Sequence, residues 1–141
     1  MDSSPGFWAA FGEVLAREYS DVNYGANHHL TVDAYALQHP GKQSPQSINS
    51  IAVHLVSLYL IFERDMTMSA ATRSMQKLVE HKAVFSWLDP SADLGQVTVR
   101  GVLNAKDAEA HVQMVKKWAE STWSAWEEYR DQVKEWAELC G

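Results

Sequence analysis

Three polar side chains stand where helical spacing predicts a hydrophobic core, and they are the first candidates for chemistry. His54 lies inside the apolar run from Ile51 to Phe62, and Asp33 flanks the apolar stripe of the preceding segment. His111 borders the apolar seam of the last segment. A buried carboxylate must be paired, hydrogen-bonded, metal-bound or protonated, because an isolated buried charge is costly. These positions therefore predict a polar site inside the fold.

A metal site is the leading interpretation of these residues. His29 lies one helical turn before Asp33, so both side chains face the same side of a helix. With His54 and His111 they would supply imidazole nitrogens and one carboxylate, which suit Zn, Ni, Fe or Mn. Helical bundles build such sites from inward-facing residues on neighbouring helices. We therefore expect a divalent metal ion in the core that activates water or a substrate as a Lewis acid.

A second face of the same segment offers other candidates. His28, Tyr35 and His39 share this face at helical spacing. If this face lines the site, His39 replaces His29 as a ligand and Tyr35 becomes a proton donor. The simpler interpretation of His39 is a hydrogen bond to the last carbonyls of its helix, because Pro40 follows it.

Two interpretations without a metal stay open. In one, His29, Asp33 and His54 form a hydrogen-bonded network that fixes the packing of the helices, since a neutral imidazole that donates to a buried carboxylate satisfies both groups. In the other, Asp33 orients an imidazole as a general base in a metal-free catalytic or ligand-binding site. Replacement of His54 by alanine separates a metal site from a structural network. The former would lose its ion, whereas the latter would lose stability.

These interpretations lead to two hypotheses of function. The first is a small metal-dependent enzyme that carries out hydrolysis or group transfer on a small molecule. The second is a non-catalytic module that binds a small molecule or forms a dimer, and whose buried His–Asp network is structural. Under the first hypothesis the partner is a small-molecule substrate, and under the second it is a ligand or a second copy of the chain.

The composition predicts one folded cytoplasmic domain over residues 1–141. Of the 141 residues, 46% are hydrophobic and 21% are charged, which is typical of a globular protein with a sizeable core. The formal net charge of −6 repels phosphate backbones and argues against nucleic acid as a partner. The single cysteine, Cys140, excludes an internal disulfide and a CxxC-type zinc site. The first residues lack signal-peptide features, and the run from Ile51 to Phe62 is too short to span a membrane.

Five segments are expected to be helical, and together they predict an all-α antiparallel bundle of four to five helices. Ser-Pro pairs at residues 4–5 and 44–45 are helix starts, with the hydroxyl as cap and the proline in the first turn. The third segment is apolar in nearly every direction, which is typical of a helix that is central or covered by a second subunit. The expected helices cover about residues 5–19, 22–38, 45–66, 69–83 and 104–140.

The last expected helix is the longest, because its apolar residues follow alternating steps of four and three from Ala108 to Cys140. Asn104 would cap it, with Asp107 as the reciprocal acid. A helix of about 45 Å needs partner helices along its length, and with the apolar third helix it predicts a homodimer. The irregular segment before it, about residues 85–103, has a weak strand pattern at 97–99. Such a segment is typical of a lid or binding loop, or of a plain excursion over one end of the bundle.

The stretch His29–Gly41, followed by Ser50–Leu55, resembles an uncharacterised bacterial family. Its members carry a similar H-x-x-T-V-D-x-Y-x-x-Q-H-P-G block and a following H-L pair, and the resemblance covers roughly residues 24–58. The family has no assigned activity. The resemblance implies one site that contains Asp33, Tyr35, Gln38, His39 and His54.

In its architecture the chain is also similar to the DinB-like helical bundles. This resemblance implies four main helices that hold a divalent metal through three histidines, and in some members a thiol-dependent transferase or isomerase activity. Those proteins usually place two ligands one turn apart on a late helix. This chain offers only Asp107 and His111 there, so it departs from the family's ligand set.

Overall fold

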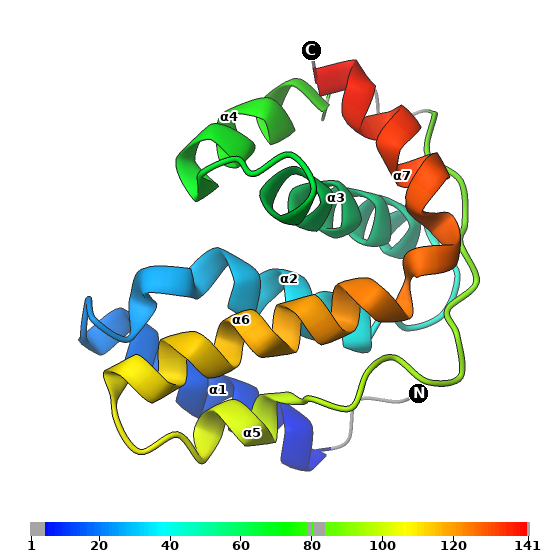
Figure 1. The fold of residues 1–141 in the computed structure, drawn as a ribbon. Coiled ribbons are helices and arrows are strands. Elements are labelled where there is room, and N and C mark those ends of the chain that lie inside the picture. The colour runs from blue at the N-terminus through cyan, green and yellow to red at the C-terminus, as the bar shows by residue number, and fades with distance from the viewer. Residues whose placement is uncertain (1–4, 79, 81–83, 141) are drawn as a thin grey trace.

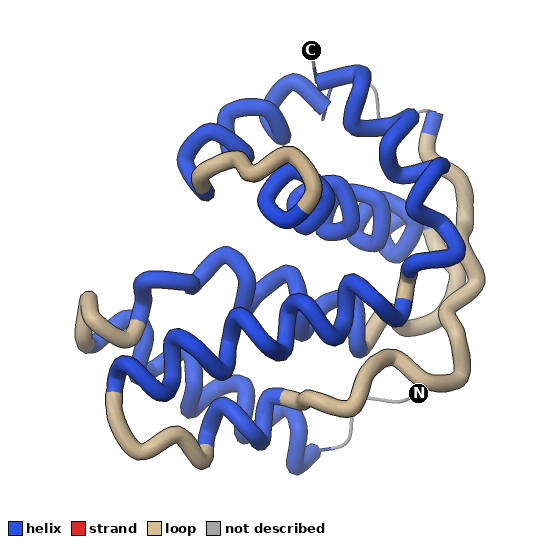
Figure 2. Tube along the Cα trace, in the orientation of Figure 1, coloured by secondary structure: helices blue, strands red, loops and turns tan. Residues whose placement is uncertain are grey.

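The computed structural model describes residues 5–78, 80 and 84–140, and every regular element in this part of the chain is helical. Figures 1 and 2 show these helices, joined by loops and short 3-10 turns. The predicted all-α helical bundle is confirmed. The α-helices are α1 (Pro5–Ser20), α2 (His28–Gln38), α3 (Pro45–Phe62), α4 (Met68–Leu78), α5 (Val99–Leu103), α6 (Ala108–Ala125) and α7 (Arg130–Ala137).

The helices form two layers (Figure 1). In one layer α1 packs against α5, and α2 packs against α6. In the other layer α3 contacts both α4 and α7. The layers are joined because α2 and α6 also contact α3. Polar residues on those faces of α2 and α3 that meet other helices are therefore enclosed.

α3 is the apolar helix at the centre of the fold. The side chain of Ser44 caps it by accepting a hydrogen bond from the backbone N–H of Ser47 (3.0 Å), and Pro45 stands in its first turn, as the sequence predicts. Residues 55–60 are all buried, because other helices contact α3 on several sides. The prediction of a central apolar helix is confirmed.

By length and composition alone, α3 could also cross a membrane. This observation is weak, since the core helix of a globular domain passes the same test and 44% of the apolar window is buried. With 18 residues, α3 is also slightly shorter than the roughly 20 residues that usually span a bilayer. The absence of a membrane partner stays a prediction.

The predicted continuous helix from about residue 104 to residue 140 is wrong. α6 ends at Ala125, a 3-10 turn covers Glu127–Tyr129, and α7 then runs along the other layer (Figure 1). Trp126 at the break is buried, and its indole N–H donates to the carbonyl of Leu37 (3.3 Å). Residues 133 and 136 remain buried after the break, where α7 contacts α3. The heptad spacing thus identifies core positions, while tertiary contacts interrupt the helix that carries them.

Several predicted helix ends also shift. α6 follows Asp107, whose carboxylate accepts a hydrogen bond from the N–H of Ala110 (2.9 Å), so Asp107 and not Asn104 is the cap. α2 starts at His28 and not near residue 22, because a turn and a 3-10 segment precede it. α3 ends earlier than predicted, at Phe62. The predicted end of the fourth helix falls on residues 79–83, most of which lie outside the described residues.

The irregular connection is confirmed for residues 85–98, whereas residues 99–103 form the short helix α5. No strand occurs at residues 97–99 or elsewhere in the described part of the chain. Phe85, Leu88 and Leu94 are buried and anchor this segment on the helices. Gly95 has a φ of +110°, which favours glycine, and a Cβ there would lie only 2.8 Å from Oγ of Ser121.

Candidate functional site

α2 carries most of the polar residues that the sequence singles out, and successive turns of this helix contact different parts of the fold. It is largely buried, and it contacts α1, α3 and α6. Its polar side chains form three clusters, at the first turn, in the middle and at the C-terminal end. Each cluster joins α2 to other elements, so the helix is a common support for the fold.

The first cluster, named the Glu18 cluster, consists of Glu18, His28, Thr31 and His111. The carboxylate of Glu18 accepts hydrogen bonds from Nδ1–H of His28 (2.8 Å) and from the hydroxyl of Thr31 (2.7 Å). Nε2–H of His111 donates to the same carboxylate (2.8 Å). One acidic group on α1 thereby joins α1, α2 and α6.

The Glu18 cluster is closed to solvent around its carboxylate. The side chains of Glu18 and His111 are 1% and 0% exposed, and both carboxylate oxygens have donors. The ring of Tyr24 covers His111 edge-on, with the ring centroids 5.0 Å apart. This geometry favours a structural role, because the loss of one partner would leave a buried charge without compensation.

The second cluster, named the Asp33 cluster, consists of Asp33, His54 and Ser57. Nδ1 of His54 lies 2.6 Å from Oδ1 of Asp33, and the hydroxyl of Ser57 donates to Oδ2 (2.7 Å). Both oxygens of the carboxylate are therefore satisfied. The cluster joins the middle of α2 to α3 and brings together two of the residues predicted from the sequence.

His54 is the member of this cluster with the clearest access to solvent, since its side chain is 20% exposed. Because Nδ1–H faces the carboxylate, the neutral ring has its lone pair on Nε2, which no hydrogen bond engages among the described residues. An imidazole held in this way can accept a proton or bind a metal ion. His28 is held in the same way by Glu18 and is 27% exposed. A carboxylate-bound imidazole is thus a recurrent packing device of this fold and does not by itself mark a catalytic site.

The third cluster lies at the C-terminal end of α2 and is named the Gln38 cluster. The side-chain N–H groups of the buried Gln38 donate to the carbonyls of Leu94 (3.0 Å) and Val97 (2.8 Å). Its side-chain oxygen accepts from the indole N–H of Trp118 on α6 (2.7 Å). Both ends of the amide are used, so Gln38 fixes the irregular segment against α2 and α6.

A cavity of about 170 Å³, named the α2-end cavity, lies beside the Gln38 cluster. Three parts of the chain line it: α1 through Phe7, the end of α2 through Gln38 and His39, and the irregular segment through residues 92–95 and 98. The volume is below the roughly 300–1,000 Å³ of sites for drug-sized ligands. The cavity therefore suits a small organic molecule.

His39 lines this cavity and packs against aromatic rings. Its backbone N–H caps the end of α2, and its ring lies 4.3 Å from the ring of Tyr35 and 5.5 Å from that of Phe7, measured between centroids. Burial lowers the pKa of the His39 imidazole below its usual range. The ring is therefore neutral at neutral pH, with one nitrogen that donates and one that accepts.

The six site residues predicted from the sequence lie in four different places. They are found in the Asp33 cluster (Asp33, His54), at the α2-end cavity (His39, with Tyr35 packed against its ring but not lining the cavity), in the Glu18 cluster (His111) and beside α4 (His29). His29 is exposed, and its Nδ1 lies 3.4 Å from the hydroxyl of Thr72. Asp107, one turn before His111, caps α6. The predicted ligand set therefore does not converge on one point.

The described side chains do not offer a complete ligand set for the expected divalent metal. Within residues 5–78, 80 and 84–140, no group of three or more His, Cys, Asp or Glu side chains has a geometry that could hold a metal ion. In the Asp33 cluster the carboxylate is already engaged by His54 and Ser57, which leaves one imidazole nitrogen. Zinc sites in proteins use three or four protein ligands. The donor set found here does not fit a bound ion, and the metal stays a prediction.

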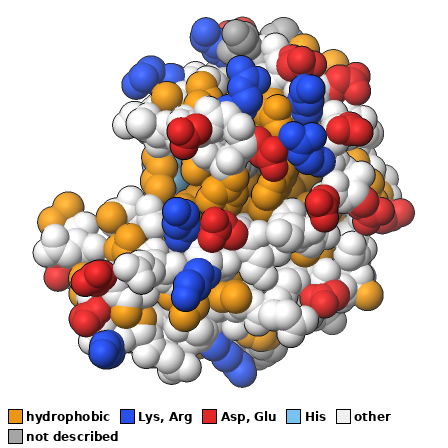
Figure 3. All heavy atoms as spheres, viewed as in Figure 1, with side chains coloured by type: hydrophobic (Ala, Val, Ile, Leu, Met, Phe, Trp, Pro, Cys, Tyr) orange, Lys and Arg blue, Asp and Glu red, His pale blue; other side chains and the backbone are white. Residues whose placement is uncertain are grey.

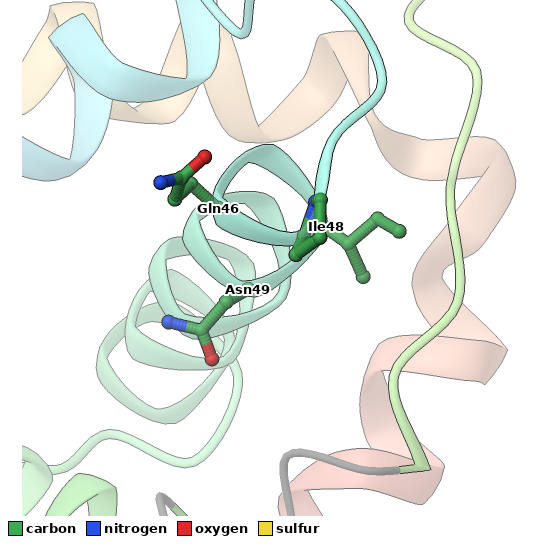
Figure 4. A pocket seen from close by; sticks show the side chains of 4 residues that line it. Gln46, Ile48 and Asn49 are labelled. Atoms are coloured by element: carbon green, nitrogen blue, oxygen red, sulfur yellow. The ribbon is translucent and has the colours of Figure 1, made fainter.

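Two other hollows lack a comparable set of polar groups. One of about 560 Å³ lies at the start of α3, where Gln46, Ile48 and Asn49 point in different directions (Figure 4). Another of about 390 Å³ lies between the layers, and hydrophobic side chains gather there in the space-filling view (Figure 3). Lys116 and Glu120 line the latter. Among the described residues, no histidine lines either hollow.

Some residues of these sites are not singled out by the sequence pattern. Val14 follows Phe11 by three residues, and Glu18 follows Val14 by four. This helical spacing places Glu18 on the buried face of α1. A charged residue at a core position of an amphipathic helix is the signal that identifies it. Asp93 and Thr98, which line the cavity, lie in the irregular segment, where no periodicity marks the positions that face a cavity.

The comparisons with known proteins identify one family. A family model described as "Family of unknown function (DUF5946)" matches residues 2–127, a range that includes all three clusters. The expectation of a family without an assigned activity is confirmed, while the motif itself stays a prediction. No curated protein and no solved structure matches the chain significantly.

Proposed function

The chain belongs to DUF5946, a family of unknown function, and we propose that it binds a small organic molecule in the α2-end cavity. His39 provides the main polar contact. The proposal corresponds to the second hypothesis from the sequence, in which the protein is a small-molecule-binding module and the buried His–Asp network is structural.

The observation that carries this proposal is a small cavity with a neutral imidazole in its wall. Ligand sites are typically concave and mostly apolar, with a few polar groups, and groups with shifted pKa values gather in them. Here Phe7 and Leu94 are apolar lining residues, while His39 and Asp93 are polar ones. The hydrogen bonds of Gln38 fix the wall before a ligand arrives, which lowers the entropic cost of binding.

A fragment screen by ligand-observed NMR tests this proposal on three proteins: the wild type, His39→Phe and His29→Phe. Phenylalanine keeps the ring packing of His39 but removes both nitrogens. His29 is the matched control, because it lies on the same helix, is exposed and does not line the cavity. We expect fragments that bind the wild type and His29→Phe and that bind His39→Phe at least roughly tenfold more weakly.

A second variant tests the cavity independently of whether His39→Phe folds. Thr98→Val removes a hydroxyl from the cavity wall and keeps the shape of the side chain. The same fragments should bind it more weakly than the wild type, while circular dichroism shows an unchanged fold. Equal binding to all four proteins, or an empty screen, would contradict the proposed function.

The metal-dependent enzyme is a second candidate, and the Asp33 cluster is the observation that favours it. A carboxylate behind an imidazole, as Asp33 lies behind His54, is the usual support of a metal-bound histidine. Elemental analysis of protein purified without an affinity tag or chelator tests this candidate. Near-stoichiometric Zn, Ni, Mn or Fe would support it, and the absence of these metals would exclude it. The DinB-like relationship, the homodimer and the cytoplasmic location also stay predictions.

A further inference from the structure

We infer that the α2-end cavity binds a small uncharged carbonyl compound with an N–H group, such as a primary amide. The inference rests on the proposed function and adds the chemical class of the ligand. It follows from the polar side chains of three of the lining residues, which carry an imidazole (His39), a carboxylate (Asp93) and a hydroxyl (Thr98).

The donor on His39 follows from the burial of its other ring nitrogen. Nδ1 is buried and has no hydrogen-bond partner among the described residues. A buried N–H without an acceptor is rarer and more costly than a buried lone pair without a donor. The proton of the neutral ring therefore lies on Nε2, the nitrogen that is not buried in this way. His39 thus donates a hydrogen bond, and its ligand must contain an acceptor.

Asp93 adds an acceptor and a negative charge to the cavity wall. Its carboxylate accepts from the backbone N–H of Gly95 (2.9 Å) and from the side-chain amide of Gln96 (3.2 Å). Since a carboxylate has about four lone-pair sites, it can also accept a hydrogen bond from a ligand. The same charge disfavours an anionic ligand. Arg100, whose guanidinium lies 4.6 Å from the ring centroid of Phe7, is not among the lining residues.

The remaining walls restrict the size and polarity of the ligand. Phe7, Leu94 and Ala92 present apolar surface, and the volume of about 170 Å³ accepts only a short apolar chain beside one polar head. The hydroxyl of Thr98 has no hydrogen-bond partner among the described residues and can donate to the same carbonyl oxygen. A primary amide satisfies all three polar groups with a carbonyl and an N–H.

Three compounds of equal shape and different charge test this ligand class. Butyramide is neutral and offers both an acceptor and donors. Butyrate offers only acceptors and is anionic, and butyramidinium offers only donors and is cationic. Their affinities are measured by NMR titration of the wild type, Asp93→Asn and His39→Phe. The Asp93→Asn variant should keep its fold, since the oxygen of the new side-chain amide can still accept from the N–H of Gly95.

We expect the wild type to bind butyramide at least roughly tenfold more tightly than either ion. Asp93→Asn should reduce the difference in affinity between butyramide and butyrate, because it removes the charge that disfavours the anion. His39→Phe should weaken butyramide and butyrate, which both accept from Nε2–H, more than butyramidinium. These three results together distinguish recognition by the named atoms from nonspecific binding to an apolar surface.

Other outcomes separate a wrong ligand class from a wrong proposed function. If butyrate or butyramidinium binds most tightly and its binding depends on His39, the inferred ligand class is wrong and the cavity remains a binding site. Failure of butyramide to bind overturns the inference as well. The proposed function itself is overturned only if no fragment binds, or if the fragments that bind the wild type bind His39→Phe equally tightly.

Discussion

At the level of single side chains, the central group of each cluster on α2 is fully hydrogen-bonded, whereas some of the histidines on this helix and on α3 keep an accessible ring nitrogen. The carboxylate of Glu18 and the amide of Gln38 use both of their ends within the protein. An imidazole nitrogen remains available on His28, His54 and His39, and of these three only His39 lines the α2-end cavity. Groups whose hydrogen bonds are all made within the protein stabilise the fold, whereas a polar atom in a cavity wall without a partner can bind a ligand.

Replacement of Glu18 by glutamine should lower the free energy of unfolding by about 2–4 kcal/mol, because the amide directs N–H groups toward donors that need an acceptor. Urea denaturation measures this change. Glu13→Gln is the matched control, since Glu13 is exposed on the same helix and its replacement should change stability by less than about 0.5 kcal/mol. Equal stability of the two variants would show that the Glu18 cluster is not structural.

Replacement of His54 by alanine should lower the free energy of unfolding by about 1–3 kcal/mol, because it removes a donor from the buried carboxylate of Asp33. His29→Ala serves as the control, because His29 is exposed. Thermal and urea unfolding of both variants measure the difference. A His54→Ala protein as stable as the wild type, but depleted of a metal that the wild type contains, would favour the enzyme hypothesis instead.

Acid should destabilise the protein in part through His39. Burial lowers the pKa of His39 in the folded state below its ordinary value of 6.5, so the unfolded chain takes up the proton first as the pH falls. The contribution of His39 to stability is therefore complete above about pH 6.5 and is lost as the pH falls through the lower pKa of the folded state. Unfolding free energies of the wild type and His39→Phe, measured over this window, should fall more steeply for the wild type. Parallel curves would contradict the lowered pKa.

At the level of the helices, sequence patterns predict those helix starts and buried faces that depend on neighbouring residues. They do not predict features that depend on contacts between distant parts of the chain. The cap and apolar run of α3 are local, and both predictions are confirmed. The break after α6 depends on Trp126 and its hydrogen bond to Leu37, 89 positions earlier in the chain, so no local pattern predicts it. The hydrogen bond between Glu18 and His111 joins residues 93 positions apart, so no local pattern predicts it either. The spacing of the apolar residues in α1 does predict that Glu18 occupies a core position.

Two glycine substitutions should have opposite effects because their surroundings differ. Gly95→Ala should destabilise the protein by about 1–3 kcal/mol, since φ is +110° and the new Cβ would lie 2.8 Å from Oγ of Ser121. Gly12→Ala should stabilise it by about 0.5–1 kcal/mol, because Gly12 lies inside α1 with nothing within 4 Å of its Cβ position. Thermal unfolding of both variants measures the effects. A neutral Gly95→Ala would show that the irregular segment is not held as described.

At the scale of the whole molecule, side-chain contacts couple the two layers. Glu63, just after α3, accepts hydrogen bonds from the indole N–H of Trp123 (3.1 Å) and from the guanidinium of Arg130 (2.8 and 3.1 Å). The hydrogen bonds from Arg130 hold the pKa of the Glu63 carboxyl below its usual range. The Asp33 cluster adds a second link between the layers. These contacts predict that the cavity and both layers belong to one cooperative unit.

The two layers should consequently unfold together. Differential scanning calorimetry of the full chain is expected to show one transition, with equal calorimetric and van't Hoff enthalpies. The double variant Asp33→Asn/Glu63→Gln weakens both links and should lower the transition temperature. Two separate transitions in the wild type would contradict this coupling and would assign α3, α4 and α7 to an independent unit.

Recognition of a small molecule by His39 in the α2-end cavity can be observed at the ring itself, by NMR of protein labelled with ¹⁵N in its histidine rings. The ring couplings report which nitrogen carries the proton, and His39→Phe assigns the signals. We predict a neutral His39 with its proton on Nε2, whose signals shift saturably with butyramide while those of His29 stay unchanged. A His39 ring that is charged at neutral pH, or that responds neither to butyramide nor to any fragment that binds the protein, would contradict recognition by His39.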